Sequence, residues 1–163
     1  MGTLHSMVKA MDFFRVRTLA TLERIEKESD PQKALGWRPG PGRAHVAWQL
    51  MHIAITEELF ATERLCPPKK PAHPDLVPRF KGGSTPDDTI PTAGDIRRVL
   101  QESRLYLVAT LGQFDDIHLG VIPEALKERK LTILDVLHIL LWHEAHHQGQ
   151  AHITLNLYKA AHP

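Results

Sequence analysis

Apolar residues recur at three- and four-residue steps in four separate stretches of the chain, a pattern typical of helices with one buried face. The first stretch covers residues 4–28, and one stripe holds its apolar positions. The stripe consists of Met11, Phe14, Thr18, Leu22 and Ile25, of which all but Thr18 are apolar. We predict that the turn-forming segment 29–31, which contains a proline, ends this helix.

Three further helices follow the same pattern. The second follows the proline- and glycine-rich segment 37–42 and stops at Pro67. The third and fourth follow Thr92 and Thr132, and in both an aspartate comes three positions after the threonine, which predicts an N-terminal capping box. The third helix keeps one apolar face as far as Phe114, and the fourth runs to about Lys159 with no internal proline.

Residues 66–91 separate the second and third helices and contain seven prolines. A loop this long inside a compact domain is usually functional or disordered. Leu76, Val77 and Phe80 give it apolar side chains to bury, so we expect an ordered flap rather than a linker between domains. With no strand pattern and no internal repeat, the sequence predicts one all-α domain over residues 1–163. This domain is a four-helix bundle with a long proline-rich loop between helices 2 and 3.

Composition and charge exclude several classes of protein. The chain has 20 basic and 19 acidic residues, too even a balance for a protein that neutralises nucleic-acid phosphates. No apolar run approaches the roughly 20 residues of a membrane span, and the N-terminus lacks a signal-peptide pattern. Cys66 is the single cysteine, so no intramolecular disulfide is possible. We therefore expect a cytoplasmic protein with no nucleic-acid or membrane partner.

Histidine is unusually frequent, with eleven in the chain and five between positions 138 and 152. His143 and His147 are four residues apart, so their side chains lie on the same face of the fourth helix. Spacing alone is weak evidence for a metal site in such a histidine-rich chain. The stripe that they share also holds Val136 and Leu140, which indicates that it faces inward. Inward imidazoles need partners, which a metal ion or a buried hydrogen-bond network can supply.

A third metal ligand would have to come from another helix, and His52 is the candidate. It shares a mostly apolar stripe with Trp48 and Leu59, so it also faces the core. His45, two turns earlier, is an outer contact, a competing ligand or a residue in water at the helix entrance. Three imidazoles leave the charge of a Zn²⁺ or Ni²⁺ ion unneutralised and a coordination position open, which favours a reactive site over a structural one.

Other known metal-binding motifs match the sequence less well. Residues 143–147 match H-E-x-x-H, the zinc metalloprotease pattern in which the glutamate is a general base. However, no glutamate follows Glu144, and the positions for the alternative glycine and histidine hold Gln150 and Ile153. A di-iron carboxylate bundle needs two E-x-x-H motifs, and the chain offers only one. A hemerythrin-like carrier would need an H-x-x-x-E element and further ligands, and the sequence has no such element.

Three segments taken together resemble the DinB/YfiT-like superfamily of bacterial four-helix-bundle metalloproteins, and most closely its DinB-like branch. They are residues 49–54 around His52, the loop 80–88 and residues 143–150. The resemblance covers most of the chain in order. It implies a metal triad of His52, His143 and His147, a divalent ion that is usually nickel or zinc, and frequently a homodimer. Gln148 departs from the arginine of many relatives, which puts a substrate or interface contact in doubt.

The resemblance implies no single reaction. Characterised relatives include transferases that place low-molecular-weight thiols on electrophiles, and a thiol-dependent isomerase. We predict a metal-dependent enzyme with a small-molecule substrate, either a thiol S-transferase acting on small electrophiles or a hydrolase. The alternatives are a non-catalytic, stress-related metal-containing binding or sensor protein, and a purely structural metal whose removal would unfold the bundle.

Four other features have candidate roles. Glu144 is either a proton acceptor or an ordinary solvated carboxylate. Gln150 and Trp48 line a pocket, or serve in packing and outer hydrogen bonds. The loop 80–85 either covers the site or is a passive surface loop. We expect Cys66 to be a bystander, because nothing near it in the sequence would activate a thiol.

Overall fold

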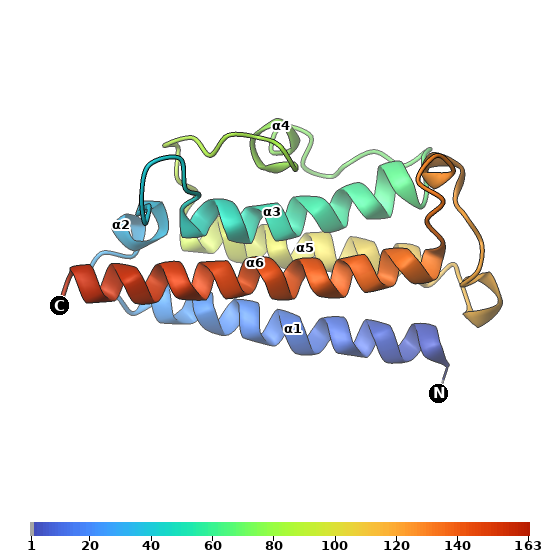
Figure 1. Cartoon of the computed structure of the whole chain (residues 1–163), viewed down its shortest axis with the longest axis horizontal. Coiled ribbons are helices and arrows are strands. Elements are labelled where there is room, and N and C mark those ends of the chain that lie inside the picture. Colours follow the sequence, from blue (N-terminus) through green and yellow to red (C-terminus); the bar gives the residue numbers. More distant parts are fainter. Residues whose placement is uncertain (1) are drawn as a thin grey trace.

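The computed structural model describes residues 2–163, and its framework is four long helices (Figure 1). These are α1 (Thr3–Glu26), α3 (Val46–Leu59), α5 (Ala93–Leu111) and α6 (Ile133–Ala161). The shorter elements are α2 (Pro31–Gly36), a π-helical segment (Phe60–Arg64), α4 (Val77–Phe80) and two 3₁₀ turns (Asp116–His118 and Glu124–Leu126). The predicted all-α four-helix bundle is confirmed. None of the helices described is both long and apolar enough to cross a membrane.

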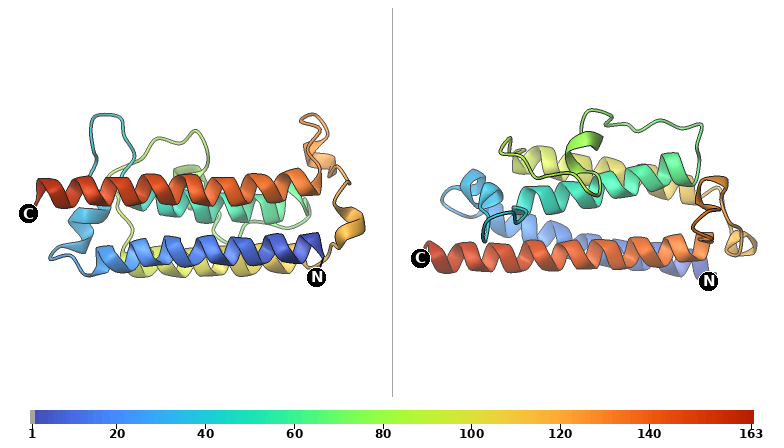
Figure 2. Two further views of the ribbon diagram at one scale, coloured as in Figure 1. Left: turned by 60° about the horizontal axis from the view of Figure 1, so that its bottom comes forward. Right: turned by 45° about the horizontal axis from the view of Figure 1, so that its top comes forward.

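The bundle joins two pairs of parallel helices. Along the chain, α1 and α6 run in one direction, while α3 and α5 run in the other (Figures 1 and 2). Helix α3 packs against both α5 and α6, and α1 packs against α6. Because α3 and α5 are parallel neighbours, the chain must travel back along the bundle between them. Residues 65–92 make that crossover, which explains the long proline-rich loop.

The first helix boundary differs from its prediction. Helix α1 ends at Glu26, and the segment 29–31 starts a further helix, α2, which was not predicted. The Asp30 side chain accepts a hydrogen bond from the Lys33 amide at 2.9 Å, and Pro31 occupies the first helical position. An aspartate cap followed by proline is a typical helix start. Pro31 therefore marks the start of a helix and not, as predicted, the end of one.

The two threonine caps form as predicted, one of them completely. Thr132 and Asp135 make a full capping box at the start of α6. At the start of α5, the Thr92 hydroxyl accepts from the Asp95 amide at 3.1 Å, but the Asp95 carboxylate accepts from that same hydroxyl at 2.7 Å. Only half of the predicted box is therefore present at Thr92.

The crossover is packed onto the bundle as an ordered flap. Phe80 of α4 is only 2% exposed. His73 lies between two carboxylates, with Nδ1 2.7 Å from Glu58 of α3 and Nε2 2.8 Å from Glu102 of α5. These contacts attach the flap to both helices that it connects.

Two apolar clusters fill the interior, one toward each end of the bundle. The first includes Leu22, Leu50, Leu100 and Leu155. The second includes Met11, Phe60, Leu107 and Leu137. In α1, α5 and α6 the two sets occupy different stretches of the helix, and a layer of other residues lies between them.

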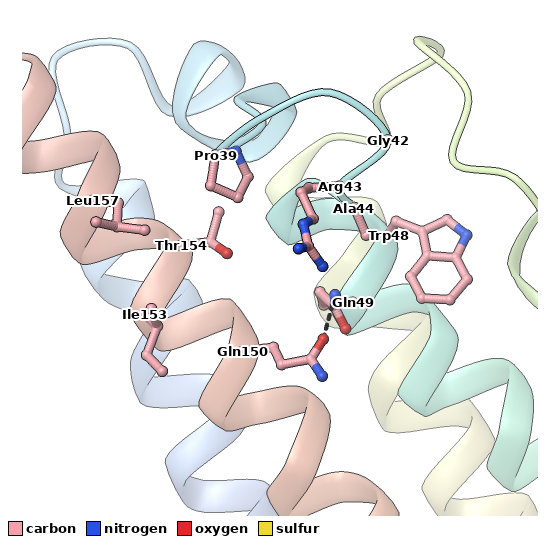
Figure 3. Close-up of a pocket in the computed structure, with 10 residues that line it drawn as sticks. All are labelled: Pro39, Gly42, Arg43, Ala44, Trp48, Gln49, Gln150, Ile153, Thr154 and Leu157. Carbon is pink, nitrogen blue, oxygen red and sulfur yellow. Dashed lines mark hydrogen bonds between the residues drawn. The ribbon is translucent and has the colours of Figure 1, made fainter.

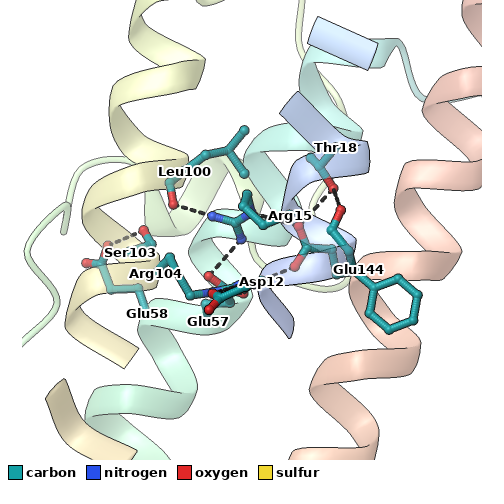
Figure 4. Close-up of polar contacts among 10 residues, drawn as sticks. Asp12, Arg15, Thr18, Glu57, Glu58, Leu100, Ser103, Arg104 and Glu144 are labelled. Atoms are coloured by element: carbon teal, nitrogen blue, oxygen red, sulfur yellow. Dashed lines mark hydrogen bonds and ion pairs between the residues drawn. The ribbon is translucent and has the colours of Figure 1, made fainter. Parts of the chain in front are cut away.

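Four buried charges, one from each long helix, occupy that layer (Figure 4). Arg15 lies 2.7 Å from Glu144 and 2.9 Å from Glu57, and Arg104 lies 2.5 Å from each of the same two carboxylates. None of the four is more than 7% exposed. Two positive and two negative charges compensate one another, as buried ions require. We call these four residues the charge layer.

The charge layer yields a test of stability. Glu144→Ala would leave Arg15 and Arg104 with an uncompensated charge in the interior. Removing one partner from a buried ion pair typically costs about 3–5 kcal/mol, and we expect a loss of that order in the free energy of unfolding measured in urea. The exposed Glu128 is the matched control, and Glu128→Ala should change stability by less than about 0.5 kcal/mol. Equal effects of the two substitutions would contradict this assignment.

Candidate metal centre

Three imidazole rings from two helices meet at one point of the bundle. His52 comes from α3, and His143 and His147 come from α6. One nitrogen from each ring lies within 4.8 Å of the others, and the Nε2 atoms of His52 and His143 are 3.1 Å apart. The structure therefore brings together the three residues that the sequence nominated.

The flap and α3 hold the His52 ring on two sides. The indole of Trp48, one turn earlier, stacks on it with ring centroids 4.6 Å apart and an interplanar angle of 16°. The Trp48 Nε1 donates in turn to the Arg79 carbonyl and to the Ser84 hydroxyl of the flap, both at 3.2 Å. His52 Nδ1 donates to the Phe80 carbonyl at 2.6 Å. Since a carbonyl only accepts, the Nδ1 atom carries the proton and Nε2, which faces His143, is unprotonated.

A chain of three hydrogen bonds fixes the His147 ring in the same manner. His147 Nδ1 donates to the Gln49 carbonyl oxygen at 2.5 Å, and the Gln49 amide donates to Gln150 at 2.8 Å. The Gln150 amide then donates to Nε2 of His146 at 2.6 Å. This polarity leaves Nε2 of His147 unprotonated. Gln49 was missed in the sequence, although its place three residues before His52 puts it on the same helix face.

The three rings are neutral at physiological pH. Burial, reinforced by the neighbouring imidazoles, lowers the pKa of His143 and His147 to about 3. Burial also lowers the pKa of His52. Metal ligation requires neutral imidazole, so the centre needs to lose no proton from these rings before it binds an ion.

The residues present fit a transition-metal ion. Two nitrogens at about 2.0–2.1 Å from a tetrahedral zinc ion lie about 3.3 Å apart, close to the observed 3.1 Å between His52 and His143. The widest spacing in the group, up to 4.8 Å, would close by small side-chain rotations. A nitrogen-only donor set with its outer ring nitrogens hydrogen-bonded suits zinc or nickel.

Glu144 lies in the charge layer and not with the three histidines. It is 2% exposed, so the expectation of a solvated carboxylate was wrong. One of its oxygens pairs with Arg15 and accepts from the Thr18 hydroxyl, while the other pairs with Arg104. These contacts occupy both oxygens inside the bundle and offer no support for the predicted role in proton transfer.

The other candidate residues also have definite places. His45 is neither a ligand nor in water: it caps α3, accepting from the Trp48 amide at 3.0 Å, and its Nε2 donates to the Asp87 carbonyl. Gln148 faces α1, donating to Thr21 at 3.2 Å. The Cys66 thiol lies beside Gln113 and outside the histidine group, as a bystander would.

Two cavities flank the centre. The larger, of about 410 Å³, lies beside Gln49 and Gln150, and Arg43 points into it (Figure 3). Trp48 and Gln150 line it, but none of the three histidines does. The smaller, of about 220 Å³, is lined by His52 and His143 themselves. The histidine group is therefore accessible from the smaller cavity.

Most of the chain matches a known protein family. A profile of the DinB superfamily matches residues 10–151. The chain belongs to the DinB superfamily. Comparisons with curated proteins and with solved structures find no match. Membership of the DinB superfamily and the grouping of three histidines are together compatible with a metal-binding protein.

Acid should destabilise this DinB-superfamily chain when no metal is bound. His143 and His147 have a pKa of about 3 in the folded protein, against about 6.5 in an unfolded chain. Between those values the unfolded chain binds protons that the folded chain does not, so the free energy of unfolding decreases as the pH falls from 7 to 4. Urea titrations of chelator-treated protein would measure this slope.

Two variants isolate that contribution. The double variant H143Q/H147Q should show a shallower decrease between pH 7 and pH 4 than the wild type. The exposed His138 lies on the same helix, and His138→Gln should retain the wild-type slope. Identical slopes in all three proteins would show that the buried rings do not govern the response to acid.

Proposed function

We propose that this chain is a divalent-metal-dependent enzyme that acts on a small electrophilic substrate. Its reaction is either the transfer of a thiol to that substrate or its hydrolysis. The observation that carries the proposal is the convergence of three neutral imidazoles beside a cavity that reaches two of them. Resemblance to DinB-like transferases supports thiol transfer. Nickel or zinc is the expected ion.

The donor count favours a reactive centre. Among the described residues, no carboxylate or thiol joins the three histidines, so the protein supplies three donors and no negative charge. Three-ligand sites leave a position for water or substrate, whereas structural zinc sites are closed by four protein ligands. A bound zinc or nickel ion would act as a Lewis acid and lower the pKa of a thiol or water held there.

The chain's own residues would orient this chemistry. The Phe80 carbonyl and the Gln49 side chain fix the His52 and His147 rings, so their free nitrogens stay aimed at one point. Apolar side chains beside His143, among them Leu59 and Ile139, would contact the non-reacting part of a substrate in the smaller cavity. In thiol transfer, the thiolate sulfur would bond to the electrophilic carbon of the substrate as the leaving group departs.

Metal content provides the first test. His147→Ala removes one of three ligands, so we expect metal stoichiometry, measured by elemental analysis after dialysis, to fall toward zero with the helical circular-dichroism signal unchanged. His138→Ala is the matched control, because His138 is an exposed histidine of the same helix and lies outside the group. A full complement of metal in the His147 variant would remove this residue from the site.

Turnover provides the second test. We expect zinc- or nickel-loaded protein to accelerate transfer of a small thiol to monobromobimane, and chelation to abolish the activity while the helices remain. Loss of the helical signal on chelation would instead mean a structural metal, since binding energy would then be folding energy. A loaded, folded protein inactive toward electrophiles and esters would favour the non-catalytic binding or sensor alternative.

A further inference from the structure

The smaller cavity is the part of the molecule best placed to hold a ligand against the histidine group. It has a volume of about 220 Å³ and includes two of the three imidazoles in its wall. Its lining residues are His52, Thr56, Leu59, Phe60, Arg64, Gly82, Arg129, Ile139 and His143. This volume is below the usual range for drug-sized ligands, which indicates a ligand of few atoms.

The charged residues that line this cavity are both positive. Arg64 and Arg129 are its charged lining residues, and no acidic side chain lines it. In the part of the chain that the structure describes, neither guanidinium forms an ion pair, while most of the other arginines do. The Arg64 guanidinium lies 5.0 Å from the Phe60 ring centroid. Two unpaired guanidinium groups beside a prospective cation site favour an anionic ligand.

The backbone beneath Arg64 is unusual in the same place. Helix α3 passes directly into the π-helical segment Phe60–Arg64, and both ends of this segment line the cavity. Single π-helical turns within α-helices occur frequently at functional sites. Thr56, one turn after His52, adds a hydroxyl to the same wall. These features are independent of the charges and point to the same cavity.

We propose that this cavity binds a small ligand through its carboxylate group, with Arg64 and Arg129 holding the carboxylate and the reactive end of the ligand placed at His52, His143 and His147. The inference rests on the proposed function and specifies its substrate class. Arginine suits this role because its planar, permanently charged guanidinium matches a carboxylate. The apolar side chains of Leu59, Phe60 and Ile139 would contact the ligand between its two ends.

Two thiols that differ in charge test this assignment. Calorimetric titration of zinc-loaded protein would compare 3-mercaptopropionate with 2-mercaptoethanol, which has a hydroxyl in place of the carboxylate. We expect at least tenfold tighter binding of 3-mercaptopropionate by the wild type. The double variant R64Q/R129Q should reduce this preference to less than twofold.

Arg43 provides the matched control. It lines the larger cavity, which includes none of the three histidines, and Arg43→Gln removes one positive charge, as each of the substitutions R64Q and R129Q does. We expect this variant to keep the tenfold preference. A preference that persists in R64Q/R129Q, or one that Arg43→Gln lowers equally, would overturn the assignment.

Two further measurements separate this inference from the proposed function. Elemental analysis should give equal zinc content in the wild type and in R64Q/R129Q. Propionate should also bind the metal-free wild type, detected by chemical-shift changes, and bind R64Q/R129Q at least fivefold more weakly. Arginine-dependent propionate binding in a protein that takes up no metal would leave the anion site standing and reject the metal enzyme. Normal zinc content together with propionate binding that does not depend on the two arginines would reject the anion site and leave the proposed metal enzyme in place.

Discussion

The rotational position of α6 about its own axis is the constraint on which the candidate site depends. Successive residues of a helix are about 100° apart, so directing Glu144 into the charge layer also sets the directions of His143 and His147. Arg15 and Arg104 hold Glu144 from two other helices. Rotating α6 by one residue would bury an unpaired charge and turn both histidines away from α3. The site is therefore held by a balanced set of ions that are not themselves part of it.

The crossover supplies the other half of this positioning. Parallel packing of α3 and α5 requires a long return segment, and that segment passes over the outer face of α3 (Figure 2). There the Phe80 carbonyl accepts from His52, while the flap also accepts from Trp48. A positive φ of 82° at Gly83, readily adopted only by glycine, allows the turn that follows. A connection required by topology thus also fixes one imidazole.

Sequence periodicity was sufficient for the four long helices and for the three histidines, because each lies on a recognisable inward stripe. It was insufficient where the contact is made by backbone or depends on tertiary packing. The Phe80 carbonyl has no residue-type signature, and nothing local shows that His45 caps a helix. Glu144 was detectable in principle, since Leu137 and Leu140 precede it by seven and four positions on one buried stripe. A charged residue on such a stripe needs a partner, and the partners come from α1 and α5.

The distribution of charge links the core to the chemistry proposed for the site. The carboxylates in the charge layer are compensated by arginines, so their negative charge does not balance that of a neighbouring ion. The three imidazoles are neutral, and the cavity beside them adds two further positive charges. A divalent ion in this position would therefore meet no uncompensated carboxylate among the three histidines and the residues that line the smaller cavity. The balancing negative charge would then come from the ligand of the ion, as a thiolate, a hydroxide or a carboxylate, which favours the anionic ligand proposed above.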